Sequence, residues 1–162
     1  MVAIDYGANV GVHAIQWATG MTGWGSMIAT EARERLYYAL AGNIVINNCF
    51  NAIAMHVAVA SEPGVLRVPQ PDYLTVSSFG SLELRPHADT EFIGQPIDYS
   101  DDKTVAIQQI SLDALALPRV DLIKLDIEGM ELEALEGASQ LIESSRPIVL
   151  VGSIKTGPDP LR

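Results

Sequence analysis

The sequence is poor in cysteine and in basic residues. Cys49 is the only cysteine among 162 residues, which excludes an intramolecular disulfide and a cysteine-rich zinc site, and no metal site is expected. Lysine and arginine number 10 against 20 acidic residues, giving a net charge of −10. Because an acidic surface repels phosphate backbones, a nucleic-acid partner is not expected.

Long apolar runs are also missing. No stretch approaches the roughly 18 consecutive apolar residues of a membrane span, so no membrane partner is expected. The first five residues lack the basic region of a signal peptide. A cytoplasmic location is therefore the expectation.

What the sequence does contain is a regular alternation of short apolar segments and amphipathic ones. With 48% hydrophobic residues, the chain has enough apolar side chains for one folded domain over residues 1–162. Strands are expected at 2–4, 27–29, 55–60, 105–110, 120–126 and 147–151, and helices at 10–19, 34–47 and from 130 onward, interrupted near Gly137. This order predicts a doubly wound α/β fold, with a mostly parallel sheet and helices on both faces.

One region departs from this alternation. In residues 65–104, prolines and polar residues interrupt short apolar stretches such as 73–76 and 81–84. These patterns favour hairpins or irregular loops, inserted after the third strand. Because the insertion follows a strand end, we assign it to acceptor recognition, with Ser78, Phe79 and Gly80 as the expected substrate contacts.

Acidic residues follow three of the expected strands, at Asp5, Glu31 and Asp126. In open α/β sheets, ligands bind beyond the carboxyl ends of the strands. Glycines at 7 and 11 would let a ligand approach the main chain at the first of these ends. The sequence therefore predicts a ligand site there.

The first turn excludes two common ligand classes. Counted from Gly7, Asn9 and Val12 replace the later glycines of a dinucleotide fingerprint, and no Gly-Lys-Ser/Thr of a phosphate loop follows. An acid before the turn and another after the second strand suit a nucleoside with an amino-acid tail. Glu31 would accept hydrogen bonds from ribose hydroxyls, and Asp5 would face the charged tail. This pattern is typical of S-adenosylmethionine sites.

Several motifs in order resemble the FkbM-type methyltransferases of the class I, Rossmann-like group. The similar segments are DYGANVGVH, IATEARERLYYALAGNIVINN, VAVASEPG, VDLIKLDIEGMELEALEGA and RPIVLV. The resemblance implies an S-adenosylmethionine-dependent methyltransferase that acts on a hydroxyl oxygen of a small molecule or glycan. The implied cofactor-binding residues are Asp5, Gly7, Ala8, Asn9, Gly11, Glu31, Asn47 and Ala58, and the implied catalytic residues are Asp126 and Glu128.

Structural interpretations of the same residues stay open. Asp5 could cap the first helix or its turn, and the acids after residue 125 could match a helix dipole. Lys124, inside an expected buried strand, should extend toward solvent or pair with an acid.

The resemblance also implies elements for which this sequence has no room. The family has a helix before the first strand and two strands after the fifth, so the domain is expected to be truncated at both ends. An alternative function is then a non-catalytic cofactor-binding or assembly subunit. The apolar strand at 147–151 would lie at a sheet edge, which predicts a homodimer through that strand.

Overall fold

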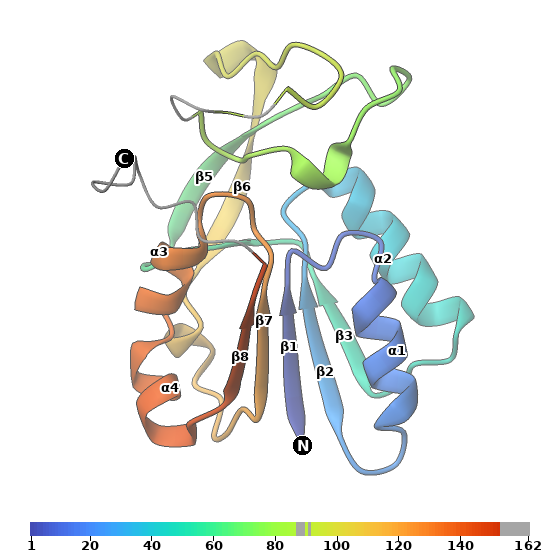
Figure 1. Ribbon diagram of the computed structural model, residues 1–162, viewed down its shortest axis with the longest axis vertical. Coiled ribbons are helices and arrows are strands. Elements are labelled where there is room, and N and C mark those ends of the chain that lie inside the picture. The colour runs from blue at the N-terminus through green and yellow to red at the C-terminus, as the bar shows by residue number, and fades with distance from the viewer. Residues whose placement is uncertain (87–89, 91, 153–162) are drawn as a thin grey trace, which may run out of the picture.

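Five parallel strands form the main sheet of the computed structural model, which describes residues 1–86, 90 and 92–152 (Figure 1). The strand order is β3-β2-β1-β7-β8, and all four pairings are parallel. The strands are β1 (Val2–Tyr6), β2 (Ser26–Thr30), β3 (Ala52–Met55), β7 (Leu122–Leu125) and β8 (Ile148–Val151). The first strand lies at the centre, between β2 and β7.

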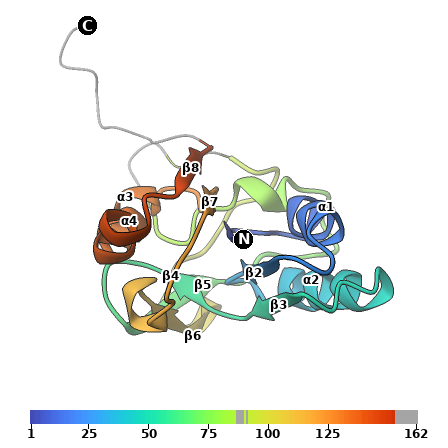
Figure 2. The ribbon, with the colours of Figure 1, turned by 90° about the horizontal axis from the view of Figure 1, so that it is seen from below.

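Helices cover both faces of this sheet, because parallel neighbours need crossover connections. Figure 2 shows α1 and α2 on one face and α3 and α4 on the other. Their bounds are α1 (Val12–Gly20), α2 (Glu34–Ile46), α3 (Glu131–Glu136) and α4 (Ser139–Ser145). The predicted doubly wound α/β class is confirmed.

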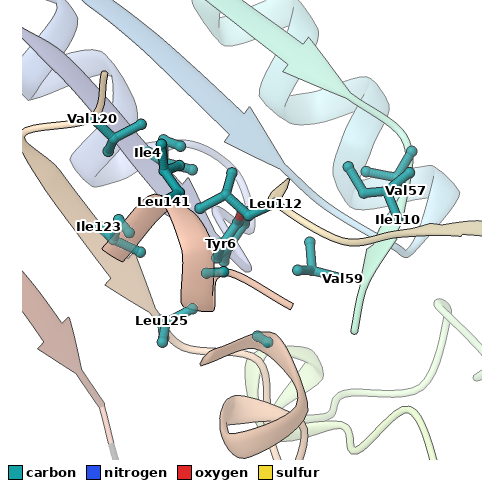
Figure 3. Close-up of a cluster of buried hydrophobic side chains, with 12 residues drawn as sticks. Ile4, Tyr6, Val57, Val59, Ile110, Leu112, Val120, Ile123, Leu125 and Leu141 are labelled. Atoms are coloured by element: carbon teal, nitrogen blue, oxygen red, sulfur yellow. The ribbon is translucent and has the colours of Figure 1, made fainter. Parts of the chain in front are cut away.

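The alternation of side chains along β1 separates two cores. Ile4 and Tyr6 pack into the cluster under α3 and α4, which is drawn in Figure 3. Ala3 packs into the second cluster, with residues of α1 and α2. Since successive strand residues point to opposite faces, Asp5 lies on the same face as Ala3, toward α1.

A second, three-stranded sheet corrects the prediction of one strand at 55–60. The main-sheet strand β3 ends at Met55, and the chain forms β4 (Ala58–Val59) in the second sheet. There β6 (Thr104–Ile110) pairs parallel with β4 and antiparallel with β5 (Gly64–Pro69). The apolar pattern of these residues does not reveal this change of sheet, because both parts are extended strands.

Of the two alternatives predicted for the apolar stretches of the insertion, hairpins or irregular loops, the structure has irregular loops. Residues 73–76 and 81–84 form no strands, and the antiparallel pair joins β5 to β6 across residues 70–103. The described residues of this connection contain the short 3-10 helices η1 (Phe79–Ser81) and η2 (Asp101–Lys103), and η3 (Asp113–Leu115) follows β6. The long antiparallel partner of β6 could not be recognised from local alternation.

Two glycines account for helix boundaries. The first helix begins at Val12 and not at residue 10, because Gly11 has φ 93°, outside the helical region. The predicted interruption near Gly137 is confirmed. A Cβ at Gly137 would lie 2.2 Å from the carbonyl oxygen of Ala60, so only glycine allows this close approach.

Among the residues that the structure describes, no helix has the length and apolar character needed to cross a membrane.

Candidate active site

The three predicted acids meet at the carboxyl edge of the main sheet. Asp5 lies in β1, Glu31 follows β2, and Asp126 follows β7, and these strands are neighbours. In Figure 1 the insertion passes over this edge. Between Glu31 and Asp126 lies a small cavity of about 20 Å³, which has room for about one water molecule and which Asp5 does not line. Its lining includes Gly7, Glu31, Arg33, Ala58, Gly80, Asp126 and Glu128.

The turn after β1 is held close to its neighbours by its backbone. Gly7 has φ 69°, and a Cβ there would lie 2.0 Å from the carbonyl oxygen of Asp126. The amide of Ala8 donates to the carbonyl oxygen of Thr30 at 2.9 Å. Asn9 is left-handed with φ 52°, a conformation that asparagine tolerates. The predicted turn residues therefore form a rigid link among β1, β2 and β7.

Glu31 is buried and fully occupied by hydrogen bonds. Its Oε2 accepts from the amide of Asn9 at 3.0 Å. Its Oε1 accepts from the amide of Arg33 at 2.9 Å and from Nε of Arg33 at 3.0 Å. Nη1 of Arg33 also donates to the carbonyl oxygen of Phe79 in η1. Arg33 therefore ties the acid after β2 to the insertion.

Asp5 has a different environment. Its side chain is 1% exposed, and its Oδ1 accepts from Nζ of Lys124 at 3.0 Å. Its Oδ2 is buried and makes no hydrogen bond with any described residue. Burial raises the pKa of the Asp5 carboxyl above its ordinary value, although Lys124 acts in the opposite direction.

The third acid is more accessible. The side chain of Asp126 is 50% exposed, and its Oδ2 lies 3.4 Å from Nζ of Lys124. Glu128 follows in a strained turn with φ 23°, and Gly129 donates its amide to Oε2 of the buried Glu131 at 3.1 Å. Asp126 and Glu128 both line the cavity. A half-exposed carboxylate at a cavity can accept a proton from a bound molecule.

The insertion contributes one wall of the cavity. Gly80 and Leu82 line it, and a Cβ at Gly80 would lie 3.2 Å from Nδ2 of Asn9. The Ser78 amide donates to the carbonyl oxygen of Ile93 at 2.7 Å, and the ring of Phe79 lies 5.0 Å from that of Tyr73. The predicted acceptor segment thus adjoins the predicted cofactor turn. Whether it contacts substrate stays a prediction.

One predicted site residue lies elsewhere. Asn47 is exposed at the C-terminal end of α2, where its Nδ2 donates to the carbonyl oxygen of Asn43 at 2.8 Å. Because α2 returns the chain to the amino end of β3, which begins at Ala52, Asn47 lies away from the carboxyl edge. The structure does not bring Asn47 together with the other predicted cofactor-binding residues, and its assignment to the cofactor site stays a prediction.

Two basic residues complete the site. Sequence analysis did not single out Arg33. The sequence feature that could have identified it is its position two residues after Glu31, the acid that follows β2. Lys124 was expected to extend toward solvent or to pair with an acid, and it pairs with two. No group of three metal-ligating side chains capable of holding an ion occurs in the part of the chain described.

The donor and acceptor set suits a nucleoside with a charged tail, but the closed cavity does not accommodate one. Pockets for such ligands usually measure about 300–1,000 Å³. Arg33 and Gly80 of η1 line the cavity together with Glu31. A ribose that binds Oε1 of Glu31 competes with the hydrogen bonds from Arg33.

Comparisons with known proteins agree with this architecture. A family model described as "Methyltransferase FkbM domain" matches residues 5–160. The crystal structure of methyltransferase FkbM from Methylobacillus flagellatus is similar with a TM-score of 0.62 and 17% sequence identity. The similarity covers 93% of this chain and 33% of that one, so this chain spans about a third of that protein's length. No curated protein matches the sequence.

Proposed function

Because the chain belongs to the FkbM methyltransferase domain family, we propose that it binds S-adenosylmethionine and transfers the methyl group to a hydroxyl oxygen. The acceptor class is a small molecule or a glycan. The observation that carries this proposal is the cavity that joins the turn after β1, the Glu31 carboxylate and Asp126. Cofactor-side acceptors and a proton acceptor therefore share one site.

Glu31 and Asp5 bind the two ends of the cofactor in this proposal. The Glu31 carboxylate accepts hydrogen bonds from the ribose hydroxyls once Arg33 moves aside. Asp5 lies on the α1 side of the turn, and its charge balances the charged amino end; a direct hydrogen bond to its Oδ2 requires a rearrangement that exposes this buried atom. When bound, the cofactor supplies a methyl group attached to a sulfonium sulfur, and this sulfur keeps the electron pair of the broken bond and leaves as a neutral thioether.

Asp126 has the role of proton acceptor. Its carboxylate takes the proton of the acceptor hydroxyl as the oxygen bonds to the methyl carbon. Alignment of the reacting atoms supplies most of the catalysis of such a displacement, and the base adds to it. Glu128, on the same wall of the cavity, is the second acid that could orient the hydroxyl.

Calorimetric titration with S-adenosylmethionine tests the cofactor site. Hydrogen bonds to a charged acceptor contribute about 1.5–3 kcal/mol, so Glu31→Ala and Asp5→Ala should each weaken binding by about ten- to a hundredfold. Glu62→Ala, at an exposed acid, is the matched control and should leave affinity unchanged. Binding that is equal in all four proteins would contradict the site, and no binding by wild type would contradict the cofactor.

Methyl transfer to a panel of hydroxylated small molecules and sugars tests the chemistry. Asp126→Asn should lower the transfer rate by about two to four orders of magnitude, the scale of a general base. Cofactor affinity should stay within about threefold, because the proposed role lies on the acceptor side. Equal losses in both would move Asp126 to the cofactor site. Cofactor binding without turnover of any acceptor would favour the non-catalytic binding subunit.

A further inference from the structure

Lys124 places one ammonium group between two carboxylates of the site. Its Nζ lies 3.0 Å from Oδ1 of Asp5 and 3.4 Å from Oδ2 of Asp126. The lysine side chain is 13% exposed, Asp5 is 1% exposed and Asp126 is 50% exposed. The ammonium group therefore connects a buried acid to an accessible one.

The sheet register produces this arrangement. Lys124 in β7 is the direct partner of Asp5 in β1, so both side chains leave the sheet on the face toward α1. The backbone next to them is fixed, because Gly7 allows its turn to contact the carbonyl oxygen of Asp126. The backbone contact therefore fixes the position of the Asp126 main chain, and Lys124 contacts the Asp126 carboxylate.

Stability alone gives little reason for this pair. Removing two charges from water costs several kcal/mol per ion, and apolar residues of similar volume often serve a fold as well. One ammonium group also faces two carboxylates here, while Oδ2 of Asp5 makes no hydrogen bond in the described part of the chain. A buried pair that is under-satisfied and that contacts Asp126, a residue of the cavity lining, points to a functional role.

We propose that Lys124 is a positioning residue, which holds Asp5 in its charged form and orients the Asp126 carboxylate at the cavity. The cofactor-binding turn and the proposed base then act as one unit. This role rests on the proposed function, although the charge state of Asp5 can be measured without any ligand.

Three described groups act on the Asp5 carboxyl besides its burial. They are Lys124 and Asp126, on or after β7, and His13 of α1. His13 and Lys124 favour the charged form, and Asp126 opposes it. Of the groups that lower the pKa of Asp5, Lys124 has the largest effect. Its removal should therefore raise this pKa more than the loss of His13 would.

The experiment is a carboxyl-detected NMR titration of aspartate-labelled protein, with the Asp5 signal assigned by Asp5→Asn. A neighbouring opposite charge shifts a carboxyl pKa by about 1–3 units, so Lys124→Met should raise the Asp5 midpoint by about one unit or more. Lys124→Arg should restore most of the difference. Lys103→Met, at an exposed lysine, is the control and should change nothing. The Asp126 signal should also move in Lys124→Met and stay in place in Lys124→Arg.

An unchanged Asp5 midpoint in a folded Lys124→Met protein would overturn the proposal. If this variant does not fold, Lys124→Gln, which keeps a donor, is titrated in its place. Unfolding of both neutral variants would assign Lys124 to stability alone and would also overturn it.

A calorimetric titration with S-adenosylmethionine on either side of the Asp5 midpoint completes the test. In wild type, affinity should fall below the midpoint, and in Lys124→Met the fall should move to higher pH with the midpoint. A purely structural role would lower affinity equally at every pH and would count against positioning. If wild type binds no cofactor while the NMR shift is observed, the proposed function fails and the charge role of Lys124 stands.

Discussion

Asp5 at the end of β1 and Glu31 after β2 are both buried, and each pairs with one basic side chain at 3.0 Å. The partner of Glu31 is Arg33, two residues later in the chain. The partner of Asp5 is Lys124, from the neighbouring strand and 119 residues away. The first pair is local and linked to the insertion, and the second belongs to the sheet.

This difference separates the two acids in function. Both carboxylate oxygens of Glu31 have partners, and Arg33 also donates to Phe79, so a ligand that binds Oε1 competes with Arg33. Asp5 keeps an unpartnered oxygen, and its lysine need not leave. The comparison teaches that the cation beside Glu31 is held by a local pair and by the insertion, whereas the cation beside Asp5 is held by the register of two strands.

The largest expected effect comes from removal of the two cations. Lys124→Met leaves the Asp5 carboxyl buried without its partner and should lower the free energy of unfolding by about 3–5 kcal/mol. Arg33→Met should cost about 1–2 kcal/mol, because Glu31 retains hydrogen bonds from two backbone amides. Urea unfolding measures both. Equal losses would remove the distinction between the pair held by strand register and the local pair.

The next effect concerns ligand access. Since Arg33 competes with the ribose for Glu31, Arg33→Met should strengthen S-adenosylmethionine binding by about tenfold, the equivalent of one exchanged interaction of about 1.4 kcal/mol. The control is Arg119→Met, at a residue that pairs with Asp121 away from the cavity. Calorimetry decides. Weaker binding in Arg33→Met would instead place Arg33 among the residues that contact the cofactor.

A pH series sharpens the comparison further. Burial raises the pKa of Asp5 in the folded state above the ordinary value of 3.8. The stability that comes from its protonated form is therefore present below the ordinary pKa and lost as pH rises through the folded-state pKa. As pH rises through this window, the free energy of unfolding of wild type minus that of Asp5→Asn should fall. The fall should be about 1.4 kcal/mol for each unit by which the Asp5 pKa differs between the folded and unfolded states.

Asp98→Asn is the matched control for this series. Hydrogen bonds from Ser100 lower the pKa of the exposed Asp98, so its contribution should have the opposite sign. Urea unfolding across the acidic range measures both differences. A flat profile for Asp5→Asn would show that burial does not control this carboxyl.

The smallest effect should arise at the strand that flanks β7 on its other side. β8 is the outer strand of the main sheet in the described part of the chain, and Ile148 is 66% exposed. The homodimer through this strand stays a prediction, and Ile148→Lys should shift it toward monomer. Val149 is unsuitable for this test because it packs against the core.

Light scattering after size exclusion reads the oligomeric state of wild type and Ile148→Lys. Both ion pairs should survive this change, so cofactor affinity should stay constant. A wild-type monomer at tens of micromolar would contradict pairing through β8.

Much of the fold followed from local patterns. Short apolar strands between amphipathic helices predicted the parallel sheet, and Gly137 predicted the interruption between α3 and α4. The acids at strand ends predicted the edge where the site lies. Prediction failed where contacts are long-range, as in the split of residues 55–60 between two sheets and the pairing of β5 with β6. The position of Asn47 at the other edge of the sheet depends on the direction of α2, which the local pattern does not give.

The sequence by itself determined the strand and helix periods, the glycine turn after β1 and the positions of Asp5, Glu31 and Asp126 at strand ends. These features depend on residues that are close in the sequence, through the spacing of apolar side chains and the backbone freedom of glycine. Only the tertiary structure decided that Lys124 stands between Asp5 and Asp126 and that Arg33 joins Glu31 to the insertion. Which side chains form ion pairs depends on the order of the strands in the sheet and on their register. Asp5 and Lys124 are 119 positions apart, and no local sequence pattern indicates that they are in contact.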